Sequence, residues 1–156
     1  MTSTFPTANV RRAWGSIPLN QVARLRQRCA KINEFYKKDR KNYKYCRAIF
    51  LHVDSRSKSH QTDVFFYHSK SKPDSKRLAK TMKKTFESKY DKHQPNRGFT
   101  GTVSARNLYV LANTSPASVF VELGNIQNTF DQRRFCNQFE PPGLGQVDDG
   151  GFHHGL

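Results

Sequence analysis

The sequence is short of acidic side chains, cysteine and long apolar runs. It holds 12 Asp and Glu against 27 Lys and Arg in 156 residues, so its formal net charge is 27 − 12 = +15. Three cysteines with no Cys-x-x-Cys pair exclude a disulfide framework and a Cys-rich zinc site, and buried reduced thiols are the favoured state of Cys29, Cys46 and Cys136. No run approaches the roughly 18 apolar residues of a membrane helix, and no signal peptide is visible in residues 1–14.

The excess of positive charge needs a polyanionic partner. A pI of about 10.1 is typical of proteins that bind nucleic acid, a membrane surface or an anionic cell-wall polymer. Basic and aromatic residues alternate within residues 35–45, as they do in segments that stack on bases. No nucleic-acid-binding signature accompanies them, so a basic nucleic-acid-binding protein is the weaker alternative and nucleic acid an unlikely partner.

The chain divides into a basic arm (residues 1–17), one domain (18–140) and a Gly/Pro-rich tail (141–156) in which we expect disorder. Apolar residues at spacings of three and four predict a helix from about residue 18, with the stripe Leu19, Val22, Leu25, Cys29, Ile32 and Phe35. The later patterns predict strands at 45–53, 62–68, 107–111 and 117–123, helices at 71–90 and 129–138, and a long loop at 91–106.

This mixture of strands and helices predicts an α/β fold, a three-layer sandwich with a mostly parallel twisted sheet flanked by helices. Two ionisable side chains, His52 and Glu122, stand where apolar strands stop. Ligands and catalysis in open α/β sheets concentrate at such strand ends. An isolated strand-end histidine is more often an ordinary surface residue, whereas a carboxylate after Val-Phe-Val is costly to bury without a role or a partner.

Residues 107–131, NLYVLANTSPASVFVELGNIQNTFD, carry a family resemblance. They are similar to the "lyVLrnt..PavLvE.gFisN..D" block of the zinc-dependent N-acetylmuramoyl-L-alanine amidases. Residues 49–54 resemble that family's "fiSIHaNa" strand, and residues 25–33 its "LaeRvalAN" helix. Arg97-Gly98 resembles the "RG" ahead of the final block. The resemblance covers about residues 18–138.

The resemblance implies roles for particular residues. His52 falls on a zinc ligand and Glu122 on the catalytic carboxylate. Arg97 and Asn128 are candidates for lining the substrate cleft. Two further candidates do not come from the resemblance: Asp54, where the family usually has Asn, could orient His52 or cap a turn, and His68 is a strand-end residue expected near the cleft. The implied cofactor is Zn²⁺, and the implied activity is a peptidoglycan hydrolase that cleaves the amide between N-acetylmuramic acid and L-alanine with zinc-activated water. The implied place of action is the cell wall, whether periplasmic, extracellular or phage-delivered.

The sequence also departs from the family. Two further zinc ligands, a histidine and a glutamate, belong to a strand and a helix that should precede Leu25, yet residues 1–24 contain neither residue type. We therefore expect a domain that lacks the family's first strand and helix and exposes a sheet edge.

Three explanations are open. A complementary chain supplies the missing ligands of a split enzyme, or the chain is a degenerate amidase that binds the wall or a partner without catalysis. In the third, ligands come from within the chain, from among His60, His68, His93, His153 and His154, the last two in the Gly-rich tail segment 148–155.

Overall fold

The computed structural model describes residues 16–55, 63–96 and 98–136, except for the side chains of residues 130 and 134–136. Most of the expected arm and all of the expected tail lie outside these residues. The elements are α2 (Gln21–Asp39), β1 (Arg47–Asp54), β2 (Phe65–His68), α3 (Pro73–His93), β3 (Thr102–Ala105), α4 (Tyr109–Asn113), β4 (Ala117–Asn125) and α5 (Thr129–Cys136). No helix within the described part of the chain could cross a membrane.

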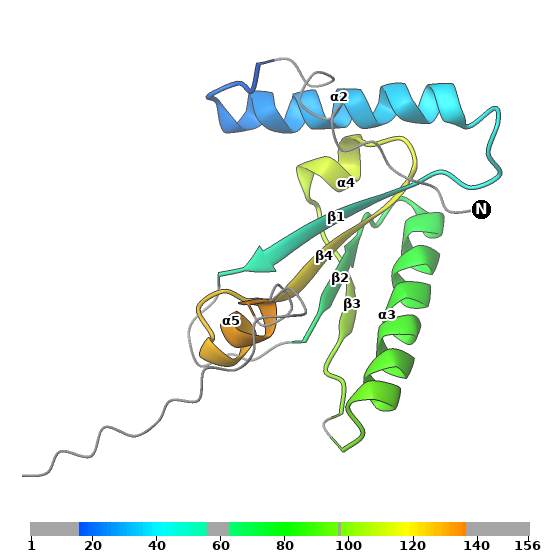
Figure 1. Cartoon of the computed structure of the whole chain (residues 1–156). Coiled ribbons are helices and arrows are strands. Elements are labelled where there is room, and N and C mark those ends of the chain that lie inside the picture. The colour runs from blue at the N-terminus through cyan, green and yellow to red at the C-terminus, as the bar shows by residue number, and fades with distance from the viewer. Residues whose placement is uncertain (1–15, 56–62, 97, 137–156) are drawn as a thin grey trace, which may run out of the picture.

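One mixed sheet forms the centre, with the strand order β1-β4-β2-β3 (Figure 1). β1 runs parallel to β4 and β2 runs parallel to β3, whereas β2 and β4 are antiparallel. Two of the three pairings are thus parallel, as the sequence predicted. β4, the last strand among the described residues, occupies the middle and pairs with both β1 and β2.

Helices cover both faces of the sheet. Side chains alternate between the two faces along each strand, so each face presents its own apolar residues for a helix to cover. On one face α2 and α4 enclose the cluster Cys29, Ala48, Phe50, Tyr67, Val110 and Leu111. On the other face α3 packs against Val64, Phe66, Val119 and Val121 through Leu78 and Ala79. The expected three-layer α/β architecture is confirmed.

The segment after residue 100 differs from the prediction. Residues 107–111 were expected to form a strand, but residues 109–113 form the short helix α4, in which the Ala112 N–H bonds to the Leu108 carbonyl at 3.0 Å. A short apolar run does not distinguish a strand from a buried helical turn. The third strand is instead β3, within the stretch expected to be a loop, where the small residues of TVSA gave no strand signal.

Polar side chains fasten α4 to its neighbours. The Asn33 side chain on α2 donates to the Asn113 carbonyl (3.0 Å) and accepts from the Ser115 N–H (2.6 Å). The Lys72 ammonium, just before α3, donates to the Leu111 carbonyl at 3.1 Å and also to the Thr114 carbonyl. The last carbonyls of α4, which have no partner within the helix, are thereby satisfied.

Of the three cysteines, Cys29 is a buried free thiol in the core, as expected, and burial raises its pKa. Cys46 is free but only partly buried, which departs from the expectation. The Cys136 side chain lies outside the described part of the chain.

β1 is an edge strand with an uncovered apolar face. Ile49, Leu51 and Val53 are 49%, 65% and 42% exposed, because they point to the side on which α3 covers β2, β3 and β4. The apolar stripe predicted for the first helix is uncovered at its ends too. Leu19, which precedes α2, and Val22 and Phe35 on α2 are exposed, while the middle of the stripe packs on the sheet. The predicted open sheet edge is therefore present among the described residues.

The burial of α4 gives the first prediction. Leu111→Ala should lower the free energy of unfolding by about 2–5 kcal/mol, because it leaves a cavity at a fully buried site. The exposed Ile49→Ala should change it by less than about 0.5 kcal/mol. Urea unfolding followed by circular dichroism measures both, and equal effects would contradict the packing described.

Candidate functional site

His52 and Glu122 lie side by side near the carboxyl ends of β1 and β4. They are register partners on the parallel strands β1 and β4, and both follow the strand positions whose side chains face α2. The His52 ring stacks on the Phe120 ring, with centroids 4.1 Å apart and planes at 17°. Because parallel strands bring their carboxyl ends to the same edge, two residues 70 positions apart share one site.

The surroundings of His52 favour its neutral form. Partial burial, and to a lesser degree the positive charge of Arg28 on α2, lower the pKa of His52 below its usual value of 6.5. Neutral imidazole is the form that binds a metal ion. The sequence did not single out Arg28, since nothing in its spacing shows that this helix position faces the end of β1.

Glu122 lies deeper than His52. Its Oε2 atom is buried, and its register partner on the other side is Phe65 of β2. The rings of Phe120 and Tyr67 continue the aromatic surface beside it. A partly buried carboxylate beside aromatic rings at a strand end is placed where it can exchange a proton with a group bound at that end of the sheet.

Asp54 and Asn128 lie close to this edge in the segments that follow the strands. Between His52 and Asp54 a bulge shifts the register, so that Asp54 pairs with Asn125, and the Asp54 carboxylate accepts from the Ser55 N–H at 2.8 Å. Asn128 accepts from the Asp131 N–H at 3.1 Å at the start of α5. In the structure both side chains organise the turns around the site.

Asp131, the last residue of the family block, is buried, and sequence reasoning gave it no role of its own. Its Oδ2 atom accepts from the Asn125 N–H at 2.9 Å and so ties α5 to the end of β4. The signal was available, since an acidic residue in the first turn of a helix is a common N-terminal feature. Its effect on the site is to fix the turn that follows Glu122.

The structure does not bring His68 to this site. β2 runs antiparallel to β4, so His68 is the register partner of Val119 while Phe65 is the partner of Glu122. His68 is buried at the opposite end of the sheet, where its Nδ1 atom lies 2.9 Å from the Ser69 carbonyl oxygen. The expectation that it lies near the cleft failed because the direction of β2 cannot be read from its composition. Arg97 lies outside the described residues.

The described residues do not offer a full set of metal ligands. They contain no group of three His, Cys, Asp or Glu side chains that could hold a metal ion. His52 and Glu122 supply one imidazole and one carboxylate, whereas a catalytic zinc site takes three protein ligands. The described residues therefore do not complete a zinc site. His60, His153 and His154 lie outside them.

The fold and site define a class: an α/β domain whose polar centre sits at the carboxyl ends of two parallel strands. The family model of the N-acetylmuramoyl-L-alanine amidases matches residues 19–139. The chain therefore belongs to that family. No curated protein matches it.

Solved structures share the fold. The N-acetylmuramoyl-L-alanine amidase of Clostridium difficile 630 has a TM-score of 0.52 and 20% identity, over 73% of this chain and 55% of its own. The catalytic domain of CwlV from Bacillus (Paenibacillus) polymyxa var. colistinus has the same score and identity, over 74% and 54%. So does CwlD from Clostridioides difficile, solved with the GerS lipoprotein, over 73% and 54%. The chain thus spans about half the length of these proteins.

The environment of His52 gives the second prediction. An NMR titration should place the pKa of His52 below 6.5. Arg28→Gln should raise this pKa only part of the way back, because burial is the larger of the two causes. A pKa at or above 6.5 in the wild-type chain would contradict the described surroundings.

Proposed function

We propose that this chain is part of a peptidoglycan hydrolase that cleaves the amide between N-acetylmuramic acid and L-alanine at the cell wall. The observation that carries the proposal is the register pairing of His52 with Glu122 at the carboxyl ends of β1 and β4. Membership of the amidase family gives this pair its chemical meaning.

Each residue of the pair has a part in the proposed reaction. Glu122 takes a proton from the attacking water and passes it to the leaving amine, as a general base and then a general acid. His52, whose surroundings lower its pKa, would hold zinc through its neutral imidazole. Zinc in such sites supplies Lewis-acid activation of the carbonyl and of water.

We propose that the remaining zinc ligands come from a complementary chain. The outer edge of β1 presents unpaired backbone groups within the described fold, and such an edge accepts another strand. The exposed Ile49, Leu51 and Val53 form an apolar strip along this edge. A strand added beside β1 would lie next to His52, which is where a further ligand is needed.

The third prediction concerns catalysis. In the active, zinc-loaded assembly, Glu122→Gln should lower kcat about 10²–10⁴-fold with little change in KM, because glutamine keeps the shape of the side chain but cannot accept the proton. Release of L-alanine amino termini from purified sacculi measures the rate. The matched control is Glu87→Gln on α3, whose carboxylate is exposed 3.8 Å from Lys83.

Two results would overturn this assignment. One is an unchanged rate in the Glu122 variant. The other is an assembly that pellets with insoluble peptidoglycan but releases no amino termini, which would identify the non-catalytic wall-binding module instead.

The fourth prediction concerns the metal and the edge strand. The isolated chain, dialysed after purification, should hold well under one zinc per chain, and the assembly purified from its native cells should hold about one. Leu51→Asp should abolish the assembly and its zinc, whereas Leu19→Asp, at an exposed leucine that precedes α2 and lies outside the sheet, should preserve both. One zinc per isolated chain, lost in His52→Ala, would show that this chain completes its own site.

A further inference from the structure

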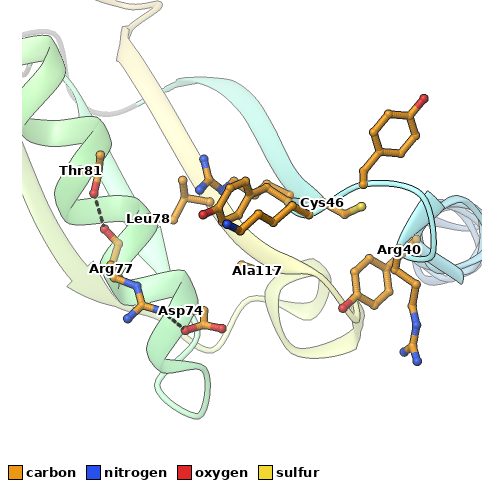
Figure 2. Close-up of a pocket in the computed structure, with 12 residues that line it drawn as sticks. Arg40, Cys46, Asp74, Arg77, Leu78, Thr81 and Ala117 are labelled. Atoms are coloured by element: carbon orange, nitrogen blue, oxygen red, sulfur yellow. Dashed lines mark hydrogen bonds and ion pairs between the residues drawn. The ribbon is translucent and has the colours of Figure 1, made fainter.

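A basic cavity lies at the end of the sheet opposite to His52 and Glu122. It has a volume of about 460 Å³ and is bounded by the end of α2, the segment leading into β1, and the first turns of α3 (Figure 2). Arg47, the first residue of β1, lines it together with its register partner Ala117. His52 is five residues further along β1, which corresponds to about 16 Å of strand.

Positive charge dominates the lining. Arg40, Lys44, Arg47 and Arg77 contribute four cations, while Asp74 contributes one carboxylate. That carboxylate is occupied, since it pairs with Arg77 at 2.5 Å on the wall formed by α3 (Figure 2). Among the described residues, Arg40, Lys44 and Arg47 make no ion pair with a carboxylate. The cavity therefore holds three cations that are available to an anion.

Tyrosine rings stand beside these cations. The Arg47 guanidinium lies 5.1 Å and the Lys44 ammonium 5.7 Å from the centroid of Tyr45, and Arg40 lies 5.9 Å from that of Tyr36. Tyr45 and Tyr43 are 68% and 64% exposed. Stacking on a ring holds a guanidinium in place while leaving its N–H donors free. Exposed rings also offer a flat apolar surface with a hydroxyl to a sugar or polyol.

We infer that this cavity binds a phosphate-bearing polymer of the cell wall, a sugar- or polyol-phosphate chain, as a site separate from the proposed catalytic pair. Arginine binds phosphate through paired N–H donors, and tyrosine accepts the intervening carbon framework. The cavity volume of about 460 Å³ lies within the roughly 300–1,000 Å³ typical of ligand pockets. A single-stranded nucleic acid is fitted less well, because it needs a groove that follows at least about four nucleotides.

The inference rests on the proposed place of action and extends it. Binding at the amino-terminal end of β1 would tether the protein to the wall and leave the edge with His52 and Glu122 clear for peptidoglycan. The two sites use no residue in common, so the binding site can be tested without zinc and without hydrolysis.

The experiment measures binding of a glycerol-phosphate oligomer to the full chain by calorimetry at fixed salt. The double variant Arg40→Gln/Arg47→Gln should weaken binding roughly tenfold or more, through loss of charged hydrogen bonds. The double variant Arg24→Gln/Arg26→Gln removes the same charge from exposed positions on α2 and should leave binding unchanged. Tyr43→Ser, which keeps every charge, should weaken binding as well.

A second readout locates the ligand. Cys46 lines the cavity and is only partly buried, whereas Cys29 is buried in the core. The oligomer should slow alkylation of Cys46 by a maleimide, measured by mass spectrometry of the peptide.

The inference is overturned by any of three results: no binding of the oligomer, equal loss of affinity in both double variants, or tighter binding of a single-stranded oligonucleotide. The first two leave the proposed amidase function intact. Conversely, oligomer binding together with no hydrolysis of sacculi by the zinc-loaded assembly would leave this site intact and contradict the proposed hydrolase.

Discussion

The parallel pairing of β1 with β4 is the interaction on which the rest of the structure depends. It joins residues that lie 117 − 47 = 70 positions apart, from Arg47 with Ala117 to His52 with Glu122. β4 also pairs with β2 on its other side. Each of the two core clusters includes side chains of β4. The register that aligns the hydrophobic faces also aligns the imidazole with the carboxylate. A slip of one residue would move both core and site to the wrong face.

The elements that sequence patterns predicted well are those with a strong periodic signal. α2, α3, β1 and β4 have apolar residues at helical or continuous spacing, and the structure places them within a few residues of the expected bounds. The strand expected at 107–111 was wrong because five apolar-rich residues fit a helical turn equally well once α2 covers them. β3 gave no signal because a short edge strand needs few apolar side chains.

The two central residues of the candidate site could be predicted from the sequence, because each stands at the end of an apolar strand and matches a family motif. His52 and Glu122 were found by both routes, and the structure places them together. His68 was misplaced because strand direction depends on long-range pairing, which local composition does not encode. The proximity of Arg28 to His52 is likewise a product of how α2 lies across the sheet. The basic cavity combines residues from α2, β1 and α3, which are far apart in the chain, so no local pattern could define it.

The central position of β4, which follows the other described strands in the chain, has a consequence for biosynthesis. The ribosome synthesises β1, β2 and β3 before β4. Of these three strands, only β2 and β3 can pair with each other before β4 emerges. Until residues 117–125 leave the exit tunnel, β1 has no partner in this sheet and its apolar side chains have no face to join. Assembly of the sheet thus waits for the synthesis of β4, and closing a loop of about 70 residues makes that step slow. During that interval Phe50 and the other apolar side chains of β1 lack the β4 neighbours against which they pack in the folded domain.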